Sequence, residues 1–399
     1  MKCPICKSGD KDEIFELNCG NFDGSFLYKN ARIISCKECG HIYNKLNAVQ
    51  YDGLYKYYNQ EYSSNNLSSK SYGGDRPGSN DSFSLRRYKN LYKLLKKYIK
   101  INYRILDGGC ATGGFMNFLS QSGFNNLFGI DFSRKYIDVA KKQGLKVKLG
   151  SVENIPYKSN SFDLVVIDQV LEHLINPSRT FSEAKKVLSP EGLLCISVPD
   201  AARYKKNRFF DFYWFLLREH IQHFDLSHLK LLGRLNGFEL VDYSREESPM
   251  MSSKMVLPAL NVLFRSQTKV VVPQKIPRDF SLKNKILSYV NQELKISNKH
   301  KIKLHRLALS KESVCAYGIG REFFYLYELA LKKCNINKLI DDTPFKQEKL
   351  KVDGRKIYGS SVLKNSSTNE NVLVTAFAHI PKLKANLKKL GYRGKFINL

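Results

Sequence analysis

Short apolar runs alternate with stretches of helical periodicity between residues 105 and 198. Apolar runs bounded by turn residues predict strands, and apolar positions three and four apart predict helices. We expect one strand to run from 105 into a glycine loop, with further strands at 126–131, 145–149, 161–168 and 193–198 and helices at 115–120 and 133–143. This repetition is typical of a parallel sheet with its ligand crevice at the carboxyl ends of the strands.

The first strand leads into a loop with the sequence Ile-Leu-Asp-Gly-Gly-Cys-Ala-Thr-Gly-Gly-Phe over 105–115. Its glycines lack the Cβ atom that would keep a ligand away from the backbone, and they permit positive φ values. Asp131 ends the second strand, 24 residues after Asp107, where such sheets present a carboxylate to a ribose. The sequence therefore predicts a nucleotide-type cofactor next to the start of the following helix.

Two Cys-x-x-Cys pairs near the amino terminus are separated by 29 residues, and they consist of Cys3, Cys6, Cys36 and Cys39. Four thiolates match a structural zinc site, which we expect to fold the segment and not to catalyse. Reduced or disulfide-bonded cysteines are the alternative. Residues 1–8 lack the apolar core of a signal peptide, so we expect a cytoplasmic protein, in which disulfides are rare. We expect Cys19 and His41 to be bystanders.

The pattern loosens after residue 245, where prolines interrupt short apolar pieces before a helix expected at 282–309. The strand-and-helix rhythm then restarts with a strand and glycine turn at 313–320, a helix at 323–333 and strands at 337–341 and 371–376. We expect this second α/β unit to serve packing or the substrate, because Gly-x-Gly alone is a weak signal. The predicted organisation is a zinc-binding unit at 1–60, a core at 83–245, a helical linker at 246–310 and a smaller Rossmann-like unit at 311–399.

The formal net charge of +28 over 399 residues raises the question of nucleic acid binding. The excess is spread along the chain and dominated by lysine, so we read it as a compositional bias and do not expect nucleic acid as the partner. A basic surface favours an anionic substrate such as a nucleotide diphosphate. The densest apolar run, 209–217, contains Asp211 and is far shorter than the roughly 20 residues of a membrane span.

The glycine loop and its surroundings resemble the class I S-adenosylmethionine-dependent methyltransferases. Their first motif usually runs Leu-Asp-x-Gly-Cys-Gly-x-Gly, and here Ala111 stands where the middle glycine is usual. This alanine is a mild departure, since its methyl group fits if φ stays negative. Glu172-His173-Leu174 after the fourth strand also resembles this family, whereas the loop departs from the Gly-x-Gly-x-x-Gly of dehydrogenases. We expect His173 to pack beneath the cofactor crevice.

This resemblance covers roughly residues 83–245 and implies S-adenosylmethionine as the cofactor. The segment 150–157 resembles the adenine side of the family's site, with Ser151 where an aspartate is usual and Glu153 as its substitute. The residues that the resemblance implies as cofactor-binding are Asp107, Gly108, Gly109, Cys110, Ala111, Gly113, Asp131, Phe132, Ser151, Val152, Glu153 and Gln169.

The order of the parts resembles the sugar C-methyltransferases that act on nucleotide-linked keto-sugars. In that family a Glu-His pair follows the fifth strand of the core, and Glu219-His220 stands in that place. The resemblance implies His220 as the base that forms an enolate and Glu219 as its neighbour, with His223 as a further catalytic candidate. Leu217 stands where a tyrosine is common. The implied process is surface-glycan or deoxysugar biosynthesis.

Alternatives stay open at this point. The chain is also compatible with O- or N-methylation of another glycan precursor, with RNA methylation in which the cysteine knuckles recognise the RNA, or with a non-catalytic scaffold. For His220, the alternative to a catalytic role is a purely structural one. Arg218, Tyr62 and Tyr72 are the candidates for stabilising the enolate. The sugar, the atom methylated and the oligomeric state are left open by the sequence.

Overall fold

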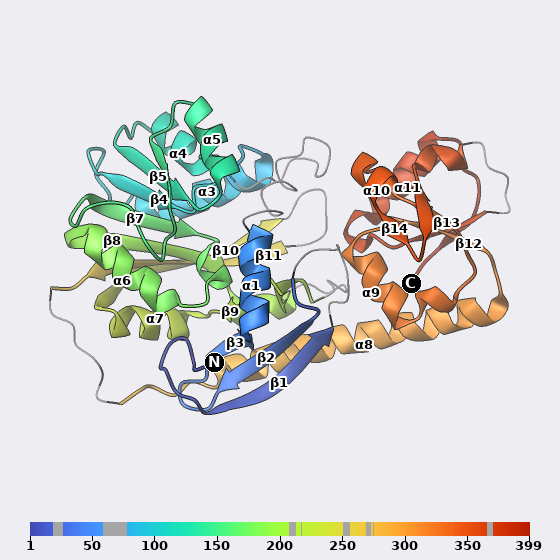
Figure 1. Cartoon of the computed structure of the whole chain (residues 1–399), viewed down its shortest axis with the longest axis horizontal. Coiled ribbons are helices and arrows are strands. Elements are labelled where there is room, and N and C mark those ends of the chain that lie inside the picture. The colour runs from blue at the N-terminus through green and yellow to red at the C-terminus, as the bar shows by residue number, and fades with distance from the viewer. Residues whose placement is uncertain are drawn as a thin grey trace.

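Three β-sheets organise the chain, and Figure 1 shows them as an N-terminal sheet below a central α/β core and a second α/β unit to the right. The computed structural model describes residues 1–18, 27–58, 78–206, 213–216, 218–249, 256–268, 273, 275–364 and 370–399. No helix in this described part of the chain is both long enough and apolar enough to cross a membrane.

The central sheet has seven strands and is parallel except for β11, which runs antiparallel to both of its neighbours. In spatial order the strands are β10 (Phe238–Pro249), β11 (Val256–Ser266), β8 (Leu188–Pro199), β7 (Phe162–Asp168), β4 (Ile105–Gly108), β5 (Leu127–Asp131) and β6 (Val147–Leu149). The inner strands are apolar and buried along nearly their whole length, as parallel strands covered on both faces are. The predicted Rossmann-like α/β class is confirmed.

Helices cover this sheet because each has one apolar stripe and a defined start. Asp81 caps the first of them by accepting the amides of Phe83 and Ser84, and Ser133 caps the third by accepting that of Tyr136. The third helix shows the stripe clearly, since it buries Tyr136, Ile137 and Ala140. The helices of the core are α3 (Ser82–Leu95), α4 (Gly114–Gln121), α5 (Arg134–Lys142), α6 (Pro177–Val187) and α7 (Leu226–Leu235).

The region expected to be a linker from residue 246 differs from that expectation. Strand β11 lies between β10 and β8, second from one edge of the central sheet, and nearly all of its residues are buried. Pro258 made the segment resemble a bridge in the sequence, but it lies near the beginning of the strand, where its carbonyl accepts the amide of Asp200. The core therefore continues to residue 266, and only the helical part of the expected linker remains.

The N-terminal sheet takes its fourth strand from the distant segment of the core that carries Glu219 and His220. Its order is β1 (Lys11–Asn18), β2 (Asn30–Cys36), β3 (Ile42–Lys45) and β9 (Gln222–His223), all antiparallel. Helix α1 (Ala48–Lys56) follows β3 and starts with a capping box between Asn47 and Gln50. The N-terminal unit is thus completed only when the core is present.

The C-terminal unit begins with α8 (Ser281–Ser310), a 30-residue helix that runs from the N-terminal sheet to the far side of the molecule in Figure 1. Its sheet is parallel apart from one hairpin, with the order β14 (Lys351–Val352), β15 (Arg355–Tyr358), β13 (Ile336–Ile340), β12 (Val314–Tyr317), β16 (Asn371–Val374) and β17 (Phe396–Ile397). The helices are α9 (Arg321–Leu329), α10 (Pro344–Lys349) and α11 (Ile380–Lys389).

Short 3-10 turns connect several of these elements. They are η2 (Leu171–His173), η3 (Ala201–Lys206), η4 (Trp214–Leu216), η5 (Leu331–Lys333), η6 (Ser360–Leu363) and η7 (Phe377–His379). The first and third of them lie in segments that contact the candidate catalytic residues described below.

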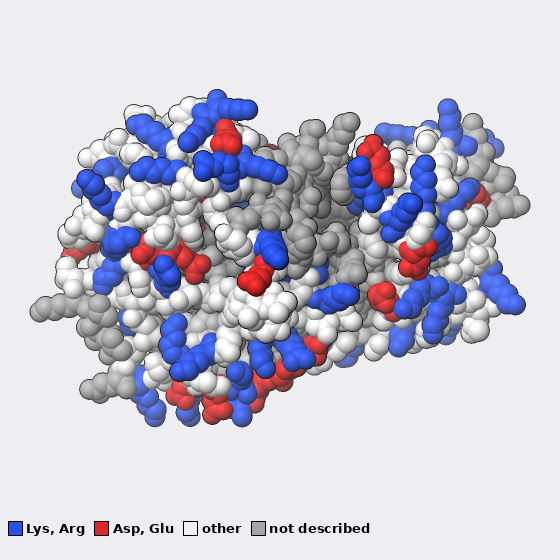
Figure 2. Space-filling model, viewed as in Figure 1, with Lys and Arg blue, Asp and Glu red and all other residues white. Residues whose placement is uncertain are grey.

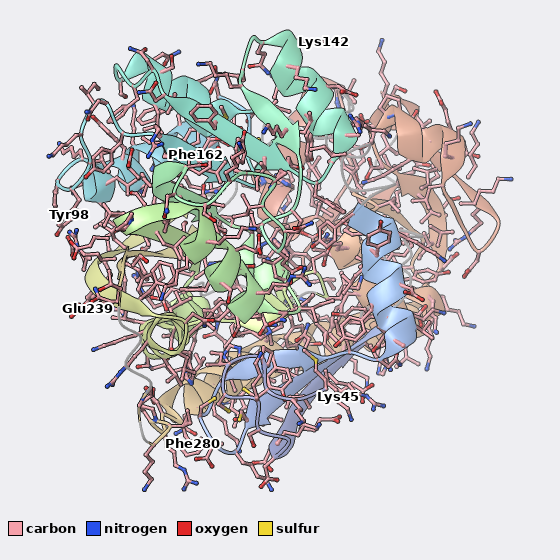
Figure 3. All side chains as sticks on the ribbon, turned by 60° about the vertical axis from the view of Figure 1, so that its left-hand side comes forward. Lys45, Tyr98, Lys142, Phe162, Glu239 and Phe280 are labelled. Atoms are coloured by element: carbon pink, nitrogen blue, oxygen red, sulfur yellow. The ribbon has the colours of Figure 1, made fainter. Side chains whose placement is uncertain are left out.

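The second cysteine knuckle and the start of α8 approach each other closely at Gly40. The Asp279 amide donates to the Cys39 carbonyl at 3.3 Å. Gly40 has a φ of +85°, and a Cβ atom built on it would lie 1.9 Å from the Asp279 carbonyl oxygen. In Figure 3, Phe280 and Lys45 both lie along the N-terminal sheet, on the lower side of the molecule. Only glycine allows this contact between knuckle and helix.

We expect Gly40→Ala to lower the free energy of unfolding by about 2–3 kcal/mol, because the new methyl group clashes with backbone and the left-handed conformation disfavours alanine. Chemical denaturation measures this change. Gly9→Ala is the matched control, since no atom lies within 4 Å of its added Cβ. A Gly40→Ala protein as stable as the control would contradict the close approach.

Candidate active site

The four cysteines of the two knuckles come together as predicted. Their sulfur atoms lie within 4.8 Å of one another, with Cys3 Sγ 3.7 Å from Cys39 Sγ and Cys6 Sγ 3.5 Å from Cys36 Sγ. These separations are too long for a disulfide, and all four thiols are free. A tetrahedral zinc ion with Zn–S bonds of about 2.3 Å places sulfurs about 3.8 Å apart, so the cluster fits this metal.

His41 is not part of this cluster. Its ring is fully buried and its Nε2 lies 2.9 Å from Gln222 Oε1, and burial lowers the pKa of His41 to about 3. His228 of α7 instead ties the knuckle to the core, because its Nε2 lies 3.1 Å from the Cys39 carbonyl and its Nδ1 lies 2.6 Å from Asp225 Oδ1. Cys19 lies outside the described residues.

The glycine loop between β4 and α4 folds back on the end of β5. The amides of Gly109 and Cys110 donate to the Ile130 carbonyl at 2.8 and 3.0 Å. The Ala111 amide donates to Asp131 Oδ2 at 2.9 Å, and the Ser133 amide donates to Asp131 Oδ1 at 2.8 Å. The two predicted parts of the cofactor site are therefore joined directly.

The condition of a negative φ, under which the methyl group fits without strain, is not met at Ala111. Its φ is +47°, in the left-handed region, and its side chain is buried. The bond from its amide to Asp131 holds the residue in this conformation, which costs about 1–2 kcal/mol for a residue with a Cβ atom. Backbone geometry thus favours the motif's usual glycine at this position, and this chain carries alanine there at an energetic cost.

Three carboxylates gather at the carboxyl ends of β4, β5 and β7. Burial, together with the nearby Asp168 and Asp131, raises the pKa of Asp107 to about 8. Burial also raises the pKa of Asp131, against the hydrogen bonds it accepts from the backbone. Arg87 Nη2 of α3 lies 2.6 Å from Asp168 Oδ2. The positive charge of Arg87 offsets part of the rise in the pKa of Asp107. Buried carboxylates that share one cation fit a positively charged ligand.

The remaining predicted cofactor residues line the same edge of the sheet. Ser151 Oγ accepts the Glu153 amide at 3.1 Å, and burial raises the pKa of Glu153. Val152 is buried, and its Cγ1 would lie 2.9 Å from a Cβ atom on Gly108. Gln169, with a φ of +56°, donates its amide to the Ser197 carbonyl at 2.8 Å.

Three further members of the predicted set show different surroundings. Gly113 has a φ of +87° and forms the N-cap of α4. Phe132 is more than one-third exposed, and its ring lies 6.4 Å from that of Tyr55. Cys110 is buried, and this burial raises the pKa of its thiol well above the usual value, so the thiol is unreactive.

A second group of side chains forms where η2 meets the segment 218–221. The His173 ring lies 5.1 Å from the His220 ring, so His173 contacts the candidate base and does not simply pack beneath the cofactor crevice. His173 Nδ1 lies 2.8 Å from the Glu219 carbonyl and 3.0 Å from Tyr58 Oη. No pattern in the sequence indicates this pairing, because η2 and the segment 218–221 are separated in the chain.

His220 has a defined tautomer in this group. Its Nδ1 lies 3.2 Å from the Phe215 carbonyl, which accepts only, so Nδ1 carries the proton and Nε2 of the neutral ring holds the lone pair. Burial and the neighbouring His173 lower the pKa of His220 to about 4. The ring is therefore neutral near pH 7, although its pKa is far below the near-neutral value that suits a general base in water.

The C-terminal unit reaches this group through Arg321, at the start of α9. Arg321 Nη2 lies 2.8 Å from Glu219 Oε1, and its guanidinium lies 5.1 Å from the centre of the Trp214 ring. Burial alone would raise the pKa of Glu219, but Arg321 and Arg218 outweigh it and lower that pKa. Glu219 is thus held as a carboxylate beside His220. No motif in the sequence marked Arg321.

The other predicted catalytic candidates that the structure describes bond to groups other than the His173 and His220 rings. His223 is fully buried in β9, with its Nε2 3.2 Å from Asn44 Oδ1 and its Nδ1 3.4 Å from Tyr204 Oη, which favours a structural role. The Arg218 guanidinium donates to the Leu27 and Tyr28 carbonyls and binds the N-terminal unit. The other two candidates for stabilising the enolate, Tyr62 and Tyr72, lie outside the described residues, as does Leu217.

The glycine turn of the C-terminal unit repeats the geometry of the first loop with one difference. The Ile319 amide donates to Asp341 Oδ2 at 2.8 Å, and the Thr343 amide donates to Asp341 Oδ1 at 2.9 Å. Lys346 Nζ also lies 2.8 Å from Asp341 Oδ2, so this acid has a cation from its own unit. This pairing favours a packing or substrate role for the unit.

Comparison with known proteins gives the class of the core. Residues 81–243 match the family model of a methyltransferase domain. An uncharacterized methyltransferase of Schizosaccharomyces pombe is 33% identical over 26% of this chain and 42% of its own length. The ubiquinone/menaquinone biosynthesis C-methyltransferase UbiE of Campylobacter jejuni is 26% identical over 28% of this chain and 50% of its own length.

Among solved structures, a SAM-dependent methyltransferase of Methanosarcina mazei is 18% identical, with a TM-score of 0.39, over 45% of this chain and 99% of that chain. The chain spans about half the length of the curated relatives it matches. From the family match, the chain carries a class I S-adenosylmethionine-dependent methyltransferase domain, whose methyl donor is S-adenosylmethionine. The buried carboxylates at the glycine loop fit this cofactor, because its sulfonium and ammonium groups are cations.

We expect Ala111→Gly to raise the free energy of unfolding by about 1 kcal/mol, because glycine adopts the left-handed conformation at this position without strain. Urea denaturation of the cofactor-free protein measures the change. Ala140→Gly, in the interior of α5, is the control and should lower that free energy by about 1 kcal/mol or more. If both variants lose stability, Ala111 is not strained.

Proposed function

We propose that the protein transfers a methyl group from S-adenosylmethionine to a carbon of a nucleotide-linked keto-sugar, with His220 as the base. The observation that carries this proposal is the meeting of three units at the Glu219-His220 pair. Asn44 of the N-terminal unit donates to the His220 carbonyl at 2.9 Å, and Arg321 of the C-terminal unit pairs with Glu219. A site built from the glycine-loop domain and both flanking units suits an acceptor larger than the reacting atom alone.

The residue types fit carbon methylation. S-adenosylmethionine, when bound, supplies a methyl group on a sulfonium, which is already a strong electrophile. A carbon beside a ketone becomes a nucleophile only when its proton is removed. His220 presents a neutral Nε2 for this proton, and the electron pair of the C–H bond forms the enolate. The enolate carbon would bond to the methyl group while the electron pair of the methyl–sulfur bond stays on sulfur, so that S-adenosylhomocysteine would leave. Glu219 stabilises the imidazolium that forms, and Arg321 holds Glu219 in place.

The curated relative UbiE supports carbon as the acceptor atom, since its name describes it as a C-methyltransferase. A nucleotide diphosphate as the carrier agrees with the net charge of +28. Figure 2 shows Lys and Arg scattered over the visible face of the N-terminal, central and C-terminal units, with Asp and Glu between them. Because the basic residues form no single stripe on this face, RNA is the less favoured acceptor.

We expect His220→Gln to lower the rate of methyl transfer by 10²- to 10⁴-fold, the range typical of a lost general base, with the affinity for S-adenosylmethionine unchanged. The assay uses labelled cofactor with a panel of nucleotide-linked keto-sugars, and calorimetry measures cofactor binding. His305→Gln is the control, because His305 is an exposed histidine of α8. Transfer to RNA and to none of the sugars would exclude the proposed substrate, and an active His220→Gln protein would exclude the base.

We also propose that Cys3, Cys6, Cys36 and Cys39 hold a structural zinc ion. The sulfur separations described above support a tetrahedral ion with no open position. The knuckle adjoins β3, and β3 pairs with the strand after His220, so the ion would stabilise the segment that carries the base. Zinc here contributes folding free energy and takes no part in the reaction.

We expect the purified protein to contain zinc that is lost in Cys36→Ser, together with faster proteolysis of the N-terminal unit, because a structural zinc ion supplies folding free energy. Elemental analysis and limited proteolysis measure the two effects. Cys334→Ser is the control, since this buried thiol lies outside the cluster. Equal zinc content in the Cys36→Ser variant and the wild type would rule out the proposed ligands.

A further inference from the structure

Glu172, His173 and His220 form a second cluster of metal-ligating side chains, separate from the four cysteines. One ligand atom from each of the three residues lies within 4.8 Å of the other two. His173 Nε2 lies 3.7 Å from Glu172 Oε1. Two ligand atoms on one tetrahedral zinc ion lie roughly 3.4 Å apart, given Zn–N and Zn–O bonds of about 2.0–2.2 Å. A shift of a few tenths of an ångström would therefore bring these two atoms to ligand distance.

Both histidines have the hydrogen bonds that metal-binding histidines usually have. The Nδ1 of His173 faces the Glu219 carbonyl at 2.8 Å, and the Nδ1 of His220 faces the Phe215 carbonyl at 3.2 Å. A carbonyl oxygen only accepts, so each Nδ1 carries a proton and each neutral ring has its lone pair on Nε2. A ligating histidine typically donates its other ring N–H to such a carbonyl, which fixes the ring and raises its basicity.

The carboxylate of this cluster lacks the partners that a buried acid needs. Glu172 is 2% exposed, and its Oε2 has no hydrogen-bond partner among the residues that the structure describes. Its Oε1 faces the lone pair of His173 Nε2. A divalent ion at this point would bind both Glu172 Oε1 and the lone pair of His173 Nε2.

We propose that Glu172, His173 and His220 bind a divalent transition-metal ion, with Zn²⁺ the best match, and that the ion inhibits methyl transfer. Imidazole and carboxylate ligands suit zinc, and two histidines with one glutamate leave a position open for water. The inhibition rests on the proposed function, because the ion takes the lone pair of His220 that removes the substrate proton. Metal binding itself does not depend on that function.

The two metal sites differ in a way that spectroscopy can separate. The cysteine cluster offers four sulfur ligands and no open position, whereas the second cluster offers two nitrogens and one oxygen. Cobalt(II) bound to thiolates gives strong sulfur-to-metal charge-transfer absorption, which cobalt on nitrogen and oxygen ligands does not show. We therefore load the zinc-containing protein with cobalt and follow the weaker ligand-field bands.

We expect the wild type to bind one cobalt ion per chain beyond its cysteine-bound zinc, without charge-transfer absorption. Glu172→Gln, which keeps the shape of the side chain, should bind this ion at least about tenfold more weakly, because one of three ligands is lost. His305→Gln is the matched control and should bind as the wild type does. Cofactor binding measured by calorimetry shows that Glu172→Gln is folded.

The kinetic measurement uses added zinc with whichever nucleotide-linked keto-sugar of the panel accepts the methyl group. Zinc should inhibit the wild type and the His305→Gln control equally, and the inhibition constant should rise at least about tenfold in Glu172→Gln. Absence of a second ion in the wild type, or equal cobalt affinity in Glu172→Gln, would overturn the metal site. Bound cobalt without zinc inhibition would overturn the inhibition alone. Failure to methylate any keto-sugar would overturn the proposed function and leave the cobalt measurement valid.

Discussion

The pairing of β3 with the segment around β9 is the contact on which the rest of the candidate site depends. Ile42 pairs with His223 and Tyr43 with Gln222, and the Asn44 amide donates to the Ile221 carbonyl at 2.8 Å. The buried Asn44 side chain bonds both the His220 carbonyl and the His223 ring. The backbone beside His220 is thereby fixed from the N-terminal unit, in addition to its attachment to the methyltransferase domain.

The Cys39 carbonyl extends this constraint to the other units. It accepts hydrogen bonds from His228 of α7 and from the Asp279 amide just before α8. Helix α8 leads from there to the unit whose Arg321 pairs with Glu219. The segment that carries the candidate base therefore contacts both the N-terminal and the C-terminal unit, and both of these units are attached to the same knuckle. This arrangement explains why a site in a widespread fold is built here from three separate parts of the chain.

Local patterns predicted the core well, and contacts between distant segments were beyond them. The strands β4, β5, β7 and β8 were found because each is an apolar run next to turn residues, and Asp131 was found because its spacing from the loop is typical. Strand β11 was missed, since burial on both faces removes the alternation that marks a strand and Pro258 suggested an interruption.

In the candidate site, too, local patterns were predicted and contacts between distant segments were not. The glycine loop predicted the cofactor edge, but the positive φ of Ala111 follows from its hydrogen bond to Asp131. His173 belongs to a motif that resembles the family, but its contact with the candidate base arises only through tertiary packing. Arg321 reaches Glu219 in the same way and had no signal in the sequence. The pKa of His220 falls to about 4 because of its burial and of His173, neither of which a single position in a sequence reveals.

The late position of β9 in the chain has a consequence for biosynthesis. Chains emerge from the ribosome with the amino terminus first, and units generally fold in that order. The knuckles and strands β1 to β3 emerge early, but the partner of β3 arrives only with residues 222–223. Until then β3 is an open edge with unsatisfied backbone groups, which is where strands of other chains associate. A nascent chain of this protein therefore passes through a long interval in which the edge of β3 is open to association with other chains.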